Sequence, residues 1–190
     1  MPSIRVGQTT SRSRTPDPAW ADGRGLRPLD RTARLSAMPE TLSHQSLFLP
    51  DEDATASLGR RLGDALRPGD TVLLDGPIGS GKSHLARALI RARLGREEDV
   101  PSPTFTLVQV YDAPEGAIWH ADLYRLTHPD EVLELGLEQA FAEAICLVEW
   151  PDRLGPHLPD RALRLSFRAE GEGRRVEARG PGRLVAAVAA

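Results

Sequence analysis

The sequence contains little cysteine and no long apolar run. Its 190 residues include one cysteine, Cys146, which excludes an internal disulfide and a zinc site built from cysteines. No apolar run approaches the length of about 20 residues that a membrane span requires. The opening segment also has no apolar stretch of the kind found in secretory signals. We therefore expect a protein of the reducing cytoplasm, with no membrane contact.

Lysine and asparagine are also scarce. The chain has no asparagine, and Lys82 is its only lysine beside 23 arginines. A composition that favours arginine so strongly indicates that the position which keeps lysine needs a compact ammonium group rather than a planar guanidinium. Lys82 is therefore a candidate functional residue.

Charge divides the chain into two parts. Residues 1–45 contain seven arginines and four acidic residues, and the whole chain has a net charge of −3, so residues 46–190 carry about −6. Such a body is a poor binder of polyanions, because nucleic-acid affinity comes mainly from neutralising phosphates. We expect any contact with nucleic acid to run through a partner protein or a local patch.

Residues 1–45 are rich in Ser, Thr, Arg, Pro and Gly and have no sustained periodicity, which predicts a disordered N-terminal extension. An alternative is that translation starts at Met38. A transit peptide is a third interpretation, but three aspartates in this stretch argue against it. The folded domain is expected over residues 46–182, with a short helix or tail at 183–190.

The body alternates between strand-like and helix-like segments. Continuous apolar runs at 71–74 and 144–148 are typical of buried strands. Apolar and polar residues alternate at 161–168 and 175–179, which predicts two strands of an antiparallel hairpin. The remaining expected strands are 46–49, 105–111 and 117–123, and the expected helices are 54–66, 85–94 and one that starts at Pro129 and continues through Phe141.

A glycine-rich segment follows the first buried strand. Residues 76–83, Gly-Pro-Ile-Gly-Ser-Gly-Lys-Ser, match the phosphate-loop pattern and come directly before a predicted helix. The backbone N–H groups of such a loop surround phosphate oxygens, and the N-terminus of the helix favours the same anion. Lys82 would reach the β- and γ-phosphates, and the Ser83 hydroxyl would hold Mg²⁺. The sequence therefore predicts nucleotide binding.

Two carboxylates end strands that should face this loop. Asp122 follows Ile-Trp-His-Ala, and Glu149 follows Ile-Cys-Leu-Val. In open α/β sheets ligands bind beyond the carboxyl ends of the strands, so both groups are candidates for the metal and the attacking water. Thr104, in Ser-Pro-Thr, could sense the γ-phosphate as part of a switch loop. Trp150 could stack on a base or ribose, or could simply pack.

Five motifs in order resemble the TsaE (YjeE) family, a group of bacterial P-loop ATPases. They are residues 76–83, Ser-Pro-Thr-Phe-Thr-Leu-Val at 102–108, His-Ala-Asp-Leu-Tyr-Arg-Leu at 120–126, Glu-Leu-Gly-Leu at 134–137 and Val-Glu-Trp-Pro at 148–151. The resemblance covers about residues 42–180. It implies an α/β fold of the P-loop type, with a mostly parallel central sheet flanked by helices and an antiparallel extension.

The same resemblance implies function. It indicates an ATP- and Mg²⁺-dependent ATPase, weak alone, that acts as a nucleotide switch with TsaD and TsaB in threonylcarbamoyladenosine (t6A) modification of tRNA. The phosphate-binding residues would be Gly76, Gly79, Ser80, Gly81, Lys82, Ser83 and His84, with Trp150 nearby. Ser83 and Asp122 would hold the metal, and Glu149, Lys82 and Thr104 would act in catalysis. His84 departs from the family, which often has a hydroxyl residue there, and this puts nucleotide affinity in doubt.

Three other functions compete with this interpretation. A GTPase would use an Asn-Lys-x-Asp element, which a chain without asparagine and with a single lysine does not have. A small-molecule kinase would need an acceptor pocket and an arginine-bearing lid, and the arginine-rich stretch 87–96 is better explained as a solvated helix face. A third alternative is a regulatory subunit that binds ATP without hydrolysing it. The role of Glu149 distinguishes this alternative from an ATPase, because only an ATPase needs Glu149 to activate water.

Overall fold

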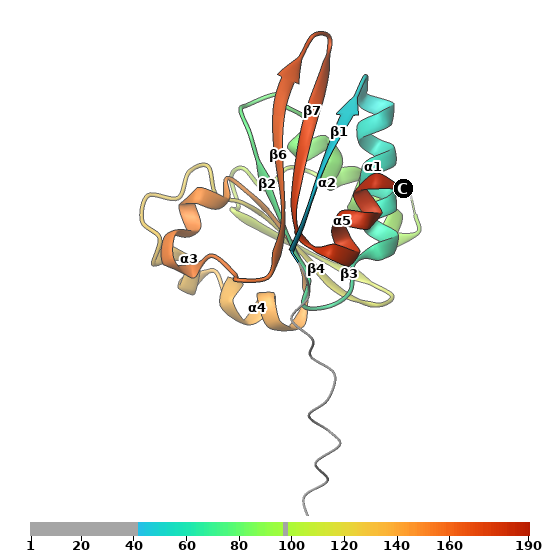
Figure 1. Ribbon diagram of the computed structural model, residues 1–190. Helices are drawn as coiled ribbons and strands as arrows, with labels where there is room; N and C mark the ends of the chain where they lie inside the picture. Colours follow the sequence, from blue (N-terminus) through green and yellow to red (C-terminus); the bar gives the residue numbers. More distant parts are fainter. Residues whose placement is uncertain (1–41, 97–98) are drawn as a thin grey trace, which may run out of the picture. The chain divides into compact units, whose positions relative to one another are not determined.

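A single sheet of seven strands with helices on both faces makes up the part of the chain that the computed structural model describes, residues 42–96 and 99–190 (Figure 1). The strands are β1 (Leu42–Leu49), β2 (Thr71–Asp75), β3 (Val108–Ala113), β4 (Gly116–Asp122), β5 (Ile145–Glu149), β6 (Ala162–Glu170) and β7 (Gly173–Pro181). The helices are α1 (Glu52–Ala65), α2 (Lys82–Leu94), α3 (Glu131–Glu134), α4 (Leu137–Glu143), the 3₁₀ helix η2 (Pro151–His157) and α5 (Gly182–Ala189). None of the helices in these ranges is long and apolar enough to span a bilayer.

The strand order is β1-β7-β6-β2-β5-β4-β3. The four central strands β6, β2, β5 and β4 are parallel, while β3 at one edge and the β7–β1 pair at the other run antiparallel to their neighbours. This arrangement confirms the predicted fold class, a mostly parallel sheet with an antiparallel extension.

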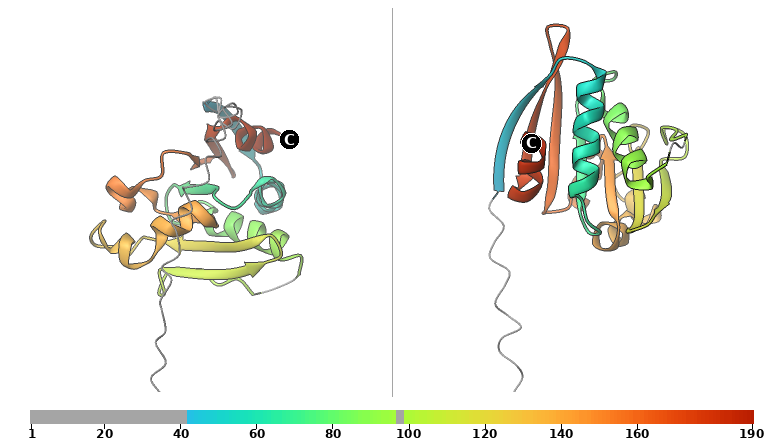
Figure 2. Two further views of the ribbon diagram at one scale, coloured as in Figure 1. Left: turned by 90° about the horizontal axis from the view of Figure 1, so that it is seen from below. Right: turned by 90° about the vertical axis from the view of Figure 1, so that its right-hand side faces the viewer.

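Side chains of the central strands alternate between two apolar layers. On β2, Val72 and Leu74 face the layer beneath α1, α2 and α5, whereas Leu73 faces the layer beneath α3, α4 and η2. Figure 2 shows these two helix groups on opposite sides of the sheet. Because both faces are covered, β2 and β5 are apolar except at their ends, which explains the two continuous runs in the sequence.

Two expected strands have different starting points. β1 begins at Leu42 rather than at residue 46, so residues 42–45 belong to the sheet and not to an extension. The rest of the predicted extension, including Met38, lies outside the described residues. β3 begins at Val108 rather than at residue 105, because the Leu107 N–H donates to the Pro103 carbonyl at 2.7 Å and Leu107 has a φ of +62°, which interrupts an extended strand.

The helix expected from Pro129 through Phe141 is broken in two. Gly136 has a φ of +74° and ends α3, and α4 starts at the next residue. A Cβ at Gly136 would lie in ordinary contact with the Trp119 ring at 3.7 Å, so the positive φ rather than a lack of space favours glycine here. As a result Val132 and Leu137 are buried, but Leu133 is nearly half exposed.

Helices α1 and α2 pack closely through glycines of α1. A Cβ added at Gly59 would lie 2.7 Å from the Leu85 carbonyl oxygen and 2.9 Å from the Ala88 Cβ. The same addition at Gly63 would meet its neighbours at 3.2 Å. This close contact matters for function, because α2 is the helix that begins at the end of the glycine-rich loop.

We predict that Gly59→Ala destabilises the protein, although alanine is the better helix former by about 1 kcal/mol. Its methyl group would force α1 away from α2, which should lower the free energy of unfolding by about 1–3 kcal/mol. Gly63→Ala is the matched control and should cost less. Urea denaturation of both variants tests this, and a Gly59→Ala variant more stable than wild type would contradict the packing described here.

Candidate active site

The glycine-rich loop connects the end of β2 to the start of α2. Gly81 is the residue before the helix and has a φ of +104°, a conformation that an L side chain rarely adopts. This geometry turns the backbone so that the first N–H groups of α2 face the loop. The structure thus has the turn that the sequence predicted, a glycine-rich loop that leads directly into a helix N-terminus. Such a geometry favours an anion.

Lys82 is the first residue of α2 and is almost completely buried. Its Nζ donates to the carbonyl oxygens of Gly76 and Pro77, both at 2.8 Å, and lies 4.5 Å from the centre of the Trp150 ring. Burial lowers the pKa of Lys82, and the nearby carboxylates of Glu149 and Asp122 oppose this shift. The ammonium group is thus held between the loop and the acidic strand ends.

Asp122 and Glu149 are neighbours across the parallel β4–β5 pair, and both are buried. The Ser83 hydroxyl donates to Glu149 Oε2 at 2.8 Å, and His120 Nε2 lies 3.0 Å from Glu149 Oε1. His120 Nδ1 is buried and has no hydrogen-bond partner within the described residues. A carboxylate oxygen only accepts hydrogen bonds, so the His120 proton belongs on Nε2, which donates to Glu149. The buried Nδ1 is then left with an unpaired lone pair rather than an unpaired N–H.

Asp122 is held by a different set of donors. The Thr104 hydroxyl donates to Asp122 Oδ2 at 2.9 Å, and the Tyr124 N–H donates to Oδ1 at 3.1 Å. Ser102 Oγ lies 3.1 Å from Thr104 Oγ1. The loop before β3 is therefore attached directly to a strand-end carboxylate, and the contact of Ser83 is with Glu149 rather than with Asp122, its expected metal partner.

These groups line one cavity of about 250 Å³, which we call the acidic pocket. Its polar lining includes Lys82, Ser83, Thr104, Asp122 and Glu149. Hydroxyl and carboxylate oxygens are the ligands that Mg²⁺ prefers, and Lys82 forms no ion pair with either carboxylate among the residues described. The donor set of the acidic pocket therefore fits a magnesium ion.

A second hollow of about 410 Å³ adjoins the same loop, and we call it the basic pocket. It shares Gly79, Lys82, Ser83 and Ser102 with the acidic pocket but has neither Asp122 nor Glu149. Its further lining residues are Glu52, Ser80, Gly81, His84, Arg87 and Arg174. The two pockets thus adjoin at the glycine-rich loop and share Lys82, but only the acidic pocket contains the strand-end carboxylates.

Trp150 and His84, two of the predicted nucleotide-binding residues, contact other side chains or the backbone of the protein. Trp150 lines the acidic pocket, where its ring packs against Lys82 and lies with its centre 5.0 Å from that of the Tyr124 ring. The His84 ring is 3.1 Å from the Glu52 carbonyl oxygen through Nε2. His84 is therefore tied to α1 at the rim of the basic pocket.

Sequence reasoning did not single out Arg174 or give His120 more than a core or supporting place. The signal for His120 was a buried-strand position two residues before Asp122, which places both side chains on one face of β4.

The loop, the helix and the acidic strand ends define the class: this is a P-loop protein with the site of a nucleotide-binding enzyme. The family model "Threonylcarbamoyl adenosine biosynthesis protein TsaE" matches residues 49–176. The chain belongs to the TsaE family, as the order of its motifs predicted.

Individual relatives support this assignment. The chain is similar to proteins named "tRNA threonylcarbamoyladenosine biosynthesis protein TsaE" from Rickettsia felis and Nostoc. The first is 35% identical over 130 residues, which cover 68% of this chain and 76% of the relative. The second is 37% identical over 134 residues, which cover 68% and 81%. A crystal structure of YdiB from Bacillus subtilis matches with a TM-score of 0.64 at 23% identity, over 78% of this chain and 93% of that one, and shares the fold.

The Glu149–His120 pair gives a testable prediction. His120→Leu removes the donor to a buried carboxylate oxygen, so the free energy of unfolding should fall by about 1–3 kcal/mol. His120→Gln keeps an amide donor in the same region and should lose less. Urea denaturation of the two variants at neutral pH measures the difference, and equal stability of wild type and His120→Leu would show that the hydrogen bond has no such role.

Proposed function

We propose that this protein is the ATP-binding and ATP-hydrolysing subunit required for t6A modification of tRNA, and that it works as a nucleotide switch with TsaD and TsaB. The observation that carries the proposal is the arrangement of Lys82 and Ser83, at the start of α2, opposite the two buried carboxylates Asp122 and Glu149. Membership of the TsaE family supports the pathway, and the relatives' names state it for those proteins.

In this proposal the chain's own residues bind and orient the nucleotide. The loop residues Gly76, Gly79, Ser80 and Gly81 surround the phosphates with N–H groups, and Lys82 exchanges its two carbonyl acceptors for phosphate oxygens.

Ser83 and Asp122 hold Mg²⁺, which neutralises charge on the β- and γ-phosphates when bound. Glu149 orients and deprotonates the attacking water, and its hydrogen bond to His120 keeps its carboxylate turned toward Ser83.

The loop around Thr104 is the proposed switch. Thr104 is bonded to Asp122, so a change at the metal side of the site reaches this loop through a single hydrogen bond. Phe105 follows directly and is 82% exposed, with the Arg125 guanidinium over its ring, and Ile78 of the glycine-rich loop is 76% exposed. An apolar rim beside the pocket supports a partner contact that responds to the bound nucleotide.

The charge of the body supports an indirect contact with tRNA. Residues 46–190 carry about −6, which disfavours direct binding to a polyanion. We therefore place the tRNA contact on the partner proteins. We also propose that this complex acts in the cytoplasm. Tight binding of tRNA by this chain alone at physiological salt would refute that placement.

ATP hydrolysis by the full chain in Mg²⁺, measured with and without the matching TsaD and TsaB proteins, tests the proposal. We expect partner stimulation, with loss of about 10²-fold or more of the stimulated rate in Lys82→Ala, because a phosphate-stabilising charge is removed. Glu149→Gln should bind ATP but hydrolyse it about 10²–10⁴-fold more slowly, since a general base is lost. Arg179→Ala, on the exposed side of β7, is the control and should behave as wild type.

Three results would contradict the proposal. Phosphate transfer to a small acceptor without partner stimulation would favour a kinase. Full hydrolysis by Glu149→Gln would remove the assigned general base, and absence of any hydrolysis in wild type with bound ATP would favour a regulatory subunit.

A further inference from the structure

Arg174 lies directly against the glycine-rich loop, although it is distant from it in sequence. A Cβ added at Gly81 would lie 2.6 Å from Arg174 Nη1, 3.5 Å from its Cδ and 3.6 Å from its Cζ. The side chain is therefore extended along the loop at the residue that precedes α2. This position is next to the N–H groups that the loop offers to an anion.

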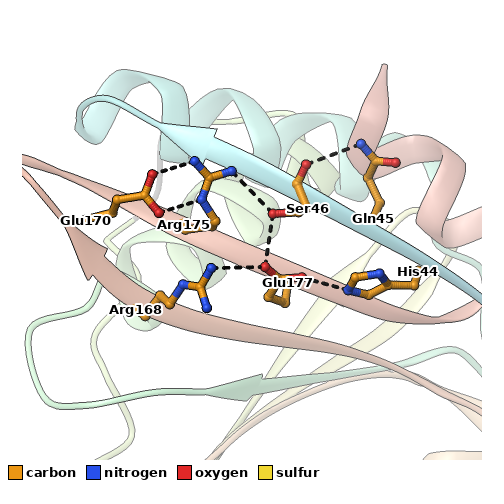
Figure 3. A network of polar contacts seen from close by, with 7 residues as sticks. All are labelled: His44, Gln45, Ser46, Arg168, Glu170, Arg175 and Glu177. Carbon is orange, nitrogen blue, oxygen red and sulfur yellow. Dashed lines mark hydrogen bonds and ion pairs between the residues drawn. The ribbon is translucent and has the colours of Figure 1, made fainter.

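The alternation of β7 explains this placement. Val176 and Ala178 point into the core beneath the helices, and Arg174 lies in the same phase, opposite Leu49 of β1. Arg175 and Glu177 occupy the other phase and belong to a polar network on the opposite face of the sheet (Figure 3). Arg174 is thus a charged residue at a core-facing position, at the end of the strand that reaches the loop.

The two neighbouring arginines differ in their partners. Arg175 forms an ion pair with Glu170 and contacts the Ser46 hydroxyl, as Figure 3 shows. Arg174 is half-buried, yet it forms no hydrogen bond or ion pair within residues 42–96 and 99–190. A cation beside a helix N-terminus is also repelled by the helix dipole. Such a position is costly to the free protein and becomes favourable when an anion binds there.

The basic pocket provides the space for that anion. Arg174 lines it together with Lys82 and Arg87, against a single carboxylate, Glu52. In P-loop proteins the lysine and the metal act on the β- and γ-phosphates, and here the candidate metal ligands lie in the acidic pocket. The basic pocket is therefore the space left for the rest of a bound nucleotide, which includes the α-phosphate.

We propose that Arg174 binds the α-phosphate side of the nucleotide, as a cation that the β6–β7 hairpin supplies to the glycine-rich loop. This inference rests on the proposed nucleotide-binding function. It also accounts for His84, which stands where a hydroxyl residue could contact that phosphate and is instead tied to the Glu52 carbonyl. A guanidinium from another element replaces the missing side-chain contact.

Isothermal titration of the full chain with ADP and with ATP tests the inference. Because ADP and ATP share the α-phosphate, Arg174→Ala should weaken binding of both by a similar factor, about tenfold or more for a lost charge-assisted contact. Arg174→Lys should restore part of the affinity. Arg179→Ala removes the same charge from the same strand on its other face and should leave both affinities unchanged. The melting temperature without nucleotide should not fall in Arg174→Ala, because no ion pair is lost.

The outcomes separate this inference from the function on which it rests. If Lys82→Ala abolishes binding while Arg174→Ala leaves ADP and ATP affinities at wild-type values, the nucleotide site stands and the role of Arg174 is wrong. A loss confined to ATP, or a lower hydrolysis rate at unchanged ADP affinity, would place Arg174 at the γ-phosphate and also overturn the inference. A wild-type chain that binds neither nucleotide would overturn both proposals.

Discussion

The structure depends most on the placement of two buried carboxylates at the ends of adjacent strands. Asp122 and Glu149 are nearly inaccessible to solvent and face each other across β4 and β5. Burying an ionised carboxylate is costly unless hydrogen bonds or opposite charges compensate. Glu149 has Ser83 and His120, and Asp122 has Thr104 and the Tyr124 N–H. Ser83 and Thr104 among these groups also line the acidic pocket, so they connect the carboxylates to the site proposed for the nucleotide.

The rest of the fold supports this arrangement. A parallel centre brings the carboxyl ends of β2, β5 and β4 to one edge, so the loop after β2 meets both acids. The close α1–α2 contact through Gly59 holds the helix that begins at Lys82. The antiparallel extension has a second effect, since its β6–β7 hairpin brings Arg174 to the same loop. Asp122 and Glu149 thus line the acidic pocket and Arg174 lines the basic pocket, while Lys82 lines both.

Local signals in the sequence were sufficient for most of the fold. Continuous apolar runs identified β2 and β5, and the loop pattern located Lys82 and Ser83. Two elements were misplaced because a single residue adopts a left-handed backbone: Leu107 delays β3 and Gly136 divides the expected helix. The early start of β1 has no such cause. The motifs named the candidate site residues that the structure brings together, but which hydroxyl meets which carboxylate could not be predicted. Those contacts depend on strand register and on a loop far along the chain. One feature of the sequence marks Arg174 as unusual: it is a charged residue at a position of β7 whose alternation otherwise faces the core. No local pattern connects that position to the glycine-rich loop.

The central claim is that Lys82 and Ser83 act on a metal-bound triphosphate opposite Asp122 and Glu149. A crystal structure of the protein with Mg²⁺ and a non-hydrolysable ATP analogue tests it most directly. The account predicts a metal ion at about 2.0–2.1 Å from Ser83 Oγ in the acidic pocket, with Lys82 Nζ moved from the Gly76 and Pro77 carbonyls to phosphate oxygens. A triphosphate bound away from the loop, or a metal ion that neither Ser83 nor a carboxylate of the pocket approaches, would contradict it.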